Sequence, residues 1–263
     1  MARPVIALLT DFGLRDHYVG TMKGVVLGIC PDATLVDLSH DVPPHDVLGG
    51  ALELAAAYRH FPPNTIFLIV VDPGVGSERR AVAVEAGGRR FVAPDNGVLS
   101  AVLEEHPPAR VVELTEPRYA RPVVSRTFEG RDRFAPAAAW LATGVDLSSL
   151  GRAAGELRRL VIPKPVVNGT TIAGEILRID RFGNLISNID RRSIEPASLD
   201  AVEVRVGGQS IPRIVSTYAA TGPGDICALF SSTDHLEIAV NGGSAAARLG
   251  LERGAPVHVV RPA

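Results

Sequence analysis

The sequence predicts an α/β N-terminal domain followed by a small all-β, barrel-like C-terminal domain. Over the first 165 or so residues, short apolar runs alternate with segments whose apolar residues recur at helical spacing, as in an α/β domain. Two prolines, Pro163 and Pro165, then interrupt the chain, and neither a helix nor a central strand continues through them. The part that follows contains mainly strand patterns. We therefore place the two domains at residues 1–165 and 166–263.

The N-terminal half contains strand and helix patterns in alternation. Apolar runs predict strands at residues 5–9, 34–38, 65–71 and 111–114. Helical spacing of apolar residues predicts helices at residues 18–28, 47–59, 96–105 and 134–142. Residues 81–85 and 90–93 resemble a hairpin around Gly87 and Gly88. This alternation predicts a mostly parallel sheet with helices on both faces.

The C-terminal half contains short strands separated by Gly, Asn and Asp. We expect strands at residues 171–179, 185–189, 201–206, 226–230, 236–240 and 257–260. Short strands with turn residues between them are typical of a small antiparallel barrel or sandwich.

Composition excludes several classes of function. The 263 residues are 46% hydrophobic and 21% charged, as in a soluble globular protein, and no segment is long and apolar enough for a membrane span. With a net charge of −2 and no basic run, we expect no nucleic-acid partner. No secretory leader is recognisable, so a cytoplasmic protein is expected. Cys30 and Cys227 lie among apolar residues, and we expect both to be small buried side chains.

Known cofactor motifs are also missing. The seven histidines do not fall into a metal-ligand spacing, and there is no GxGxxG, Walker loop or GxSxG motif. We therefore expect neither a metal nor another cofactor.

The most informative segment runs from Val70 to Arg80. An apolar strand pattern there leads directly into Asp72-Pro73-Gly74-Val75-Gly76, and Arg79 follows shortly after. Ligands in open α/β sheets bind at the carboxyl ends of strands, where this Asp and Arg could share one site. An Asx turn beside an exposed arginine is the structural alternative.

Other polar residues follow further strand patterns. Asp11 follows the first strand, two residues before Gly13, where it either joins Asp72 or caps a turn or the following helix. Arg131 and Asp132 are expected to form a structural ion pair at a helix start. Asp180 and Asn184 are normal turn residues. Glu237 lies in an apolar strand pattern, where a charged group faces solvent or meets a partner.

Taken together and in this order, these segments resemble the S-adenosylmethionine hydroxide adenosyltransferases, which split S-adenosylmethionine into adenosine and methionine and are related to the fluorinases and chlorinases. The matching segments are Thr10-Asp11-Phe12-Gly13, Asp46-Val47 with the Gly-Gly-Ala after Leu48, Val71-Asp72-Pro73-Gly74-Val75-Gly76, Ala93-Pro94-Asp95-Asn96-Gly97, Thr127-Phe128, Gly130-Arg131-Asp132, Phe182-Gly183-Asn184 and Leu236-Glu237-Ile238-Ala239-Val240-Asn241. The resemblance covers nearly the whole chain. It implies a homotrimer whose sites lie between subunits.

The resemblance also implies a role for individual residues. Asp72 and Arg79 match two members of the Asp–Arg–His group that handles the attacking water. The residues implied in substrate binding are Asp11 at the ribose hydroxyls, Phe128 near the reacting carbon, Asp180 and Asn184 at the amino-acid or adenine end, and Ser232, Glu237 and Val240 along the adenine and methionine pocket.

One position departs from the family's pattern. Where the family has Thr-Phe-His-Gly, this chain has Thr127-Phe128-Glu129-Gly130, so the third member of the catalytic group is Glu129. Glu129 is then a general base, since two close carboxylates resist double ionisation, or a partner that fixes Arg79, or a change that disables the site. Thr233 stands where the halogenases carry an Arg, which leaves that contact to the methionine carboxylate open.

The sequence therefore predicts hydrolysis of S-adenosylmethionine by in-line attack on the ribose C5′. A halogenase is the nearest alternative, but an acid pair would repel a halide. The second alternative is a non-catalytic protein that binds adenosine or S-adenosylmethionine.

Overall fold

The computed structural model describes residues 3–194 and 199–261, and the chain divides into two compact units. The first unit is Met1–Ile162 and the second is Pro163–Ala263. The division falls at the first of the two prolines. Each unit has its own hydrophobic core and is described by itself.

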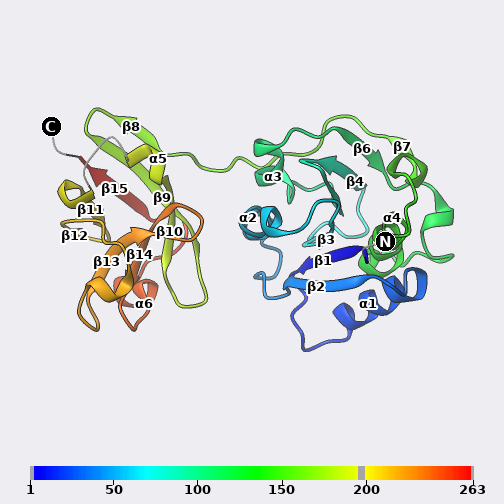
Figure 1. Ribbon diagram of the computed structural model, residues 1–263, viewed down its shortest axis with the longest axis horizontal. Coiled ribbons are helices and arrows are strands. Elements are labelled where there is room, and N and C mark those ends of the chain that lie inside the picture. Colours follow the sequence, from blue (N-terminus) through cyan, green and yellow to red (C-terminus); the bar gives the residue numbers. More distant parts are fainter. Residues whose placement is uncertain (1–2, 195–198, 262–263) are drawn as a thin grey trace. The chain divides into compact units, whose positions relative to one another are not determined.

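The first unit is built on a seven-stranded sheet in the order β2-β1-β3-β5-β4-β6-β7 (Figure 1). Its strands are β1 (Val5–Thr10), β2 (Thr34–Ser39), β3 (Ile66–Val70), β4 (Ala81–Ala86), β5 (Arg89–Pro94), β6 (Arg110–Glu113) and β7 (Arg152–Ala153). All five residues of β3 are buried, as expected for a central strand that is covered on both faces.

The prediction of a mostly parallel sheet is wrong, because the sheet is mixed. Strands β2, β1, β3 and β5 are parallel neighbours, whereas β4 runs antiparallel to both β5 and β6, and β6 runs antiparallel to β7. The cause is the hairpin between β4 and β5. Gly87 and Gly88 both have positive φ, at 55° and 70°, which is the backbone of a tight two-residue turn that reverses the chain.

Helices cover both faces of this sheet (Figure 1), as the sequence predicts. The helices are α1 (Tyr18–Ile29), α2 (Val47–Ala57), η1 (Tyr58–His60), α3 (Ser100–Glu105), η2 (Pro117–Tyr119), the π-helix η3 (Gly130–Phe134), α4 (Ala135–Ala142) and η4 (Leu147–Leu150). Side chains alternate between the faces of β1: Ile6 and Leu8 pack with α1 and α4, and Ala7 and Leu9 pack with α2 and α3.

The second unit is a nearly closed, barrel-like antiparallel sheet, as the sequence predicts (Figure 1). The strand order is β12-β11-β15-β9-β10-β14-β13, and β8 also pairs with β9. Its strands are β8 (Val166–Asn168), β9 (Thr171–Ile179), β10 (Leu185–Asp190), β11 (Glu203–Val206), β12 (Gln209–Ile211), β13 (Ile226–Phe230), β14 (His235–Val240) and β15 (Pro256–Val260). The short helices are α5 (Arg191–Ile194), η5 (Leu199–Ala201), η6 (Tyr218–Ala220) and α6 (Ala245–Leu249).

Candidate active site

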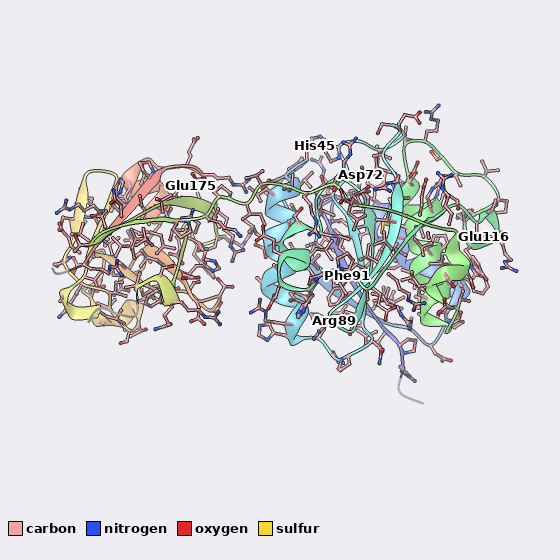
Figure 2. All side chains as sticks on the ribbon, turned by 90° about the horizontal axis from the view of Figure 1, so that it is seen from above. His45, Asp72, Arg89, Phe91, Glu116 and Glu175 are labelled. Carbon is pink, nitrogen blue, oxygen red and sulfur yellow. The ribbon has the colours of Figure 1, made fainter. Side chains whose placement is uncertain are left out.

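Polar groups gather at one end of the N-terminal sheet. The parallel register pairs Thr10 with Val70, so Asp11 and Asp72 follow neighbouring strands at the same edge. Figure 2 shows Asp72 at the opposite end of the sheet from Arg89, where β5 begins. Asn96, which follows β5, joins this edge because its Nδ2 donates to Val71 O at 2.8 Å. Three loops therefore converge at the carboxyl ends of β1, β3 and β5.

Asp72 and Arg79 form a bidentate ion pair. Arg79 Nε lies 2.9 Å from Asp72 Oδ1, and Arg79 Nη2 lies 2.5 Å from Asp72 Oδ2. The two side chains are only 5% and 4% exposed. A buried, bidentate carboxylate–guanidinium contact fixes both groups in one orientation. The exposed-arginine alternative is therefore wrong.

The turn between these two residues requires Gly76. Its φ is 77°, and a Cβ there would lie 2.4 Å from Arg126 O. Only a residue without a side chain fits both constraints. This turn brings Arg79 back beside Asp72.

Glu129 completes the group from another part of the chain. Arg79 Nη1 donates to Glu129 Oε2 at 2.9 Å, and Glu129 is 8% exposed. Glu129 immediately precedes the π-helix η3, and π-turns occur frequently at functional sites. The guanidinium of Arg79 also lies 5.3 Å from the centroid of the Phe134 ring. The geometry therefore matches the hypothesis in which Glu129 pairs with Arg79.

A second arginine balances the charge of this group. Arg133 Nε lies 3.6 Å from Glu129 Oε2, too far for a hydrogen bond but close enough for an ion pair. Two carboxylates, Asp72 and Glu129, thus alternate with two guanidinium groups. In the described part of the chain, Arg133 Nε is one of two buried side-chain nitrogens without a hydrogen-bond partner.

Arg79 is held as a permanent cation. Burial is the largest single influence on its pKa and lowers it. Hydrogen bonds and attraction from Asp72 and Glu129 together outweigh burial and raise the pKa above the usual arginine value. A guanidinium has five N–H donors, and the bonds to Asp72 and Glu129 engage one hydrogen on each nitrogen. The second hydrogens on Nη1 and Nη2 have no acceptor among the described residues.

Aromatic side chains surround Phe128. Phe128 is 8% exposed, and the ring centroids of Tyr18 and Phe12 lie 5.1 Å and 6.2 Å from its own. The Arg131 guanidinium lies 5.2 Å from the Phe128 ring centroid. Arg131 Nε and Asp132 Oδ1 are 2.7 Å apart, so the expected structural ion pair is present. The proximity of Phe128 to a reacting carbon stays a prediction.

Asp11 has one fixed and one open carboxylate oxygen. Its Oδ2 accepts from His45 N at 2.8 Å, and Figure 2 shows His45 at the Asp72 end of the unit. Among the described residues, nothing donates a hydrogen bond to Asp11 Oδ1. The side chain is half-buried. Its proposed contact with ribose hydroxyls stays a prediction.

In the second unit, Asp180 and Asn184 form the expected turn. Asp180 Oδ1 accepts from the backbone nitrogens of Phe182 and Asn184, each at 2.9 Å, and Asp180 Oδ2 accepts from Asn184 Nδ2 at 3.0 Å. Phe182 is 77% exposed at the tip of this turn. A turn thus accounts for the positions of both polar residues. A role in holding substrate stays a prediction for them.

Glu237 meets a partner that the sequence did not identify. Tyr218 Oη donates to Glu237 Oε1 at 2.7 Å, and Glu237 is 3% exposed on β14. Burial raises the pKa of Glu237, and the nearby charge of Asp180 adds to this effect, whereas the bond from Tyr218 opposes it. Val240 is buried on the same strand, and Ser232 is exposed in the loop before it. Tyr218 lies in an irregular segment, where no periodic pattern marks a partner.

The structure shows no site for a metal in its described ranges. Across residues 3–194 and 199–261, no three His, Cys, Asp or Glu side chains gather in a way that could hold an ion. Cys30 and Cys227 are both buried and unbonded, as expected. No described helix meets the length and hydropathy needed to cross a membrane.

Comparison with known proteins gives consistent matches over both units. Residues 6–151 match the model of the SAM hydroxide adenosyltransferase N-terminal domain, and residues 174–258 match that of the C-terminal domain. The chain is 39% identical to the (R)-S-adenosyl-L-methionine hydrolase of Thermus thermophilus, over 98% of this chain and 100% of that protein. It is 40% identical to the protein of the same name from Salinispora tropica, over 97% of each chain. A crystal structure of an uncharacterized conserved protein from Thermotoga maritima is 37% identical, covers 97% of this chain and 100% of its own, and superposes with a TM-score of 0.92.

Proposed function

The chain belongs to the SAM hydroxide adenosyltransferase family, and on this premise we propose that it hydrolyses S-adenosyl-L-methionine to adenosine and L-methionine. The reaction is an in-line attack of an activated water on the ribose C5′. The observation that carries the proposal is Arg79, buried and held between Asp72 and Glu129.

The chemistry makes few demands on the protein. The leaving group is a neutral thioether, so it departs without an acid. The nucleophile is weak, and it must be positioned, lose a proton and be kept from bulk water. A fixed guanidinium beside two carboxylates can position the water and accept its proton.

Arg79 and Asp72 act on the water in this proposal. The free N–H groups of Arg79 hold the water oxygen, and the fixed positive charge favours its hydroxide form. Asp72 accepts the proton on Oδ1, which accepts one bond from Arg79 and keeps a lone pair, whereas Oδ2 accepts bonds from both Nε and Nη2 of Arg79. The O–C5′ bond then forms as the C5′–S bond breaks, and the electron pair of that bond stays on sulfur.

Glu129 serves as the positioning partner of Arg79 in this proposal. Its Oε2 lies 2.9 Å from Arg79 Nη1 and 3.6 Å from Arg133 Nε, so this oxygen faces two cations. Of the three hypotheses for Glu129, the 2.9 Å contact with Arg79 supports pairing best.

The remaining predicted residues bind substrate in this proposal. Asp11 takes the ribose hydroxyls with its open oxygen, and Phe128 packs near C5′. Asp180, Asn184, Ser232, Glu237 and Val240 form the amino-acid and adenine end. Following the family resemblance, we also propose a homotrimer with sites between subunits, a cytoplasmic location, no cofactor and no nucleic-acid partner.

The test is incubation of the purified protein with S-adenosylmethionine and chromatography of the products. Because the relatives' names specify the (R) sulfonium, both sulfonium epimers are tested separately, with and without chloride and fluoride. Adenosine and methionine in equal amounts support the proposal. Halogenated adenosine would identify a halogenase, and tight adenosine binding without methionine release would identify a binding protein; either result overturns it.

A further inference from the structure

A series of hydrogen bonds begins at Thr10, the residue before Asp11, and has no part in the mechanism above. Thr10 Oγ1 and His40 Nδ1 are 2.8 Å apart, and His40 Nε2 lies 2.9 Å from Asp37 Oδ1. Lys23 Nζ lies 2.6 Å from Asp37 Oδ2. Thr10 is fully buried and His40 is 4% exposed, whereas Asp37 and Lys23 reach the surface.

The bond between His40 and Asp37 has a defined direction. Burial is the largest single influence on the pKa of Asp37 and raises it, but hydrogen bonds and attraction from Lys23 and His40 together outweigh burial and lower the pKa. Asp37 is therefore an ionised carboxylate, which only accepts. His40 Nε2–H therefore donates to Asp37, and the opposite ring nitrogen, Nδ1, bonds to the Thr10 hydroxyl. A hydroxyl oxygen has two lone pairs, so Thr10 Oγ1 has one for a backbone donor whichever way its bond to His40 runs.

That donor is the backbone N–H of the residue that follows Asp11. Phe12 N donates to Thr10 Oγ1 at 3.3 Å, and Gly13 N donates to His40 O at 2.7 Å. His40 thus holds the loop after β1 twice, once through Thr10 and once through its own carbonyl. Gly13 has a φ of 65°, and its backbone turns the chain at this point.

We propose that Thr10 and His40 are positioning residues for Asp11. This proposal rests on the proposed function, in which Asp11 binds the ribose hydroxyls. The Thr10–Phe12 bond spans Asp11, and the His45 amide fixes its Oδ2, so the open Oδ1 is presented in one direction. A catalytic role does not fit Thr10, because its hydroxyl is fully buried and already bonded.

The affinities of two ligands distinguish a role of Thr10 in positioning Asp11 from a role in fold stability alone. Adenosine carries both ribose hydroxyls, and 2′,3′-dideoxyadenosine carries neither. Calorimetry on the full chain gives the ratio of their affinities, which we expect to be about a hundredfold in the unmodified protein. In Thr10→Val, which keeps the shape but removes the hydroxyl, the ratio should fall by about tenfold.

Thr10→Ser and Thr65→Val are the matched variants. Thr10→Ser keeps the hydroxyl and should keep the ratio. Thr65 is also buried, and its Oγ1 donates to Pro62 O at 2.8 Å just before β3 begins, so Thr65→Val loses a comparable bond away from Asp11. A purely structural role for Thr10 would weaken both ligands equally and leave the ratio unchanged in every variant.

Asp37→Ala tests the surface end of the chain and covers the case in which Thr10→Val does not fold. Asp37 has a side chain that is 40% exposed, so its loss is tolerated more easily. We expect the affinity ratio to fall here as well. An unchanged ratio in Thr10→Val, or in Asp37→Ala if Thr10→Val does not fold, overturns the proposal. Absence of any adenosine binding by the unmodified protein would instead contradict the proposed function.

Discussion

The chain buries carboxylates in two different ways in its two units. In the first unit, Asp72 and Glu129 face the guanidinium of Arg79, and their charges are compensated by ion pairs. In the second unit, Glu237 meets the neutral hydroxyl of Tyr218, and burial raises its pKa. A compensated cluster places a fixed cation beside a proton acceptor, as the activation of a water requires. The bond from Tyr218 and the nearby charge of Arg178 offset the burial of Glu237 only in part, so its pKa stays raised.

Removal of Arg79 should have the largest effect. Arg79→Met leaves Asp72 and Glu129 buried without the cation between them, so the free energy of unfolding should fall by about 3 kcal/mol. Turnover should fall by roughly a thousandfold or more, because the water loses its fixed positive charge. Denaturant titration and a product assay measure the two effects.

Arg80→Met is the control for this change. Arg80 pairs with Asp95 at 2.6 Å but does not contact Asp72 or Glu129 in the structure. It should lose stability and keep the turnover of the folded protein. Comparable turnover in the two variants would mean that Arg79 has no special role.

Replacement of Glu129 should have a smaller effect. Glu129→Gln keeps an oxygen that accepts from Arg79 Nη1, so turnover should fall by about tenfold, whereas loss of a general base costs about 10²–10⁴-fold. Glu129→His restores the residue of the family pattern and should remain active. Rates measured across pH for both variants distinguish the hypotheses: a loss above a hundredfold in Glu129→Gln alone would restore the general-base role.

Glu237→Gln should act on the pH dependence of stability. Because the folded-state pKa of Glu237 is raised from its ordinary value of 4.5, its contribution to stability is fully present below that pH and is lost as pH rises through the folded-state pKa. The Gln variant lacks this loss. The unfolding free energy of Glu237→Gln, relative to the unmodified protein, should therefore increase as pH rises above 4.5. A difference that does not vary with pH would contradict the raised pKa.

Changes at Asp180 should have the smallest effect. Asp180→Asn keeps one oxygen for the Phe182 and Asn184 amides and should cost less than about 1 kcal/mol in unfolding free energy. Asp180→Ala removes all three bonds of the turn and should cost about 1–2 kcal/mol. If Asp180→Asn were the more harmful of the two, the turn would not account for this residue.

Much of the fold follows from local patterns, and its remaining features depend on distant contacts. The predicted strand at residues 226–230 and the hairpin around Gly87 coincide with observed elements, because apolar periodicity and turn residues act locally. The hairpin reverses β4 and makes the sheet mixed, a consequence that strand patterns alone do not reveal. The helix predicted from Asn96 begins only at Ser100, because the Asn96 side chain binds the backbone of Val71 and Val98.

The candidate site shows the same division. Only a short turn separates Asp72 and Arg79 in the sequence, so a shared site is one of two interpretations, and the structure shows the ion pair. The bond from Tyr218 to Glu237 joins an irregular segment to a strand, and no spacing rule predicts it. The sequence does not identify His40 for the same reason, because His40 follows β2 and its partner Thr10 ends β1.

Hydrolysis in water enriched in ¹⁸O tests the proposed chemistry most directly. In-line attack at C5′ by the water held on Arg79 places one ¹⁸O atom in the 5′-hydroxyl of adenosine and none in methionine. We expect mass spectrometry to find this label in adenosine formed by the unmodified protein, and adenosine formation to be lost in Arg79→Met. Adenosine without the label, or a halogenated product in its place, would contradict attack by water at this site.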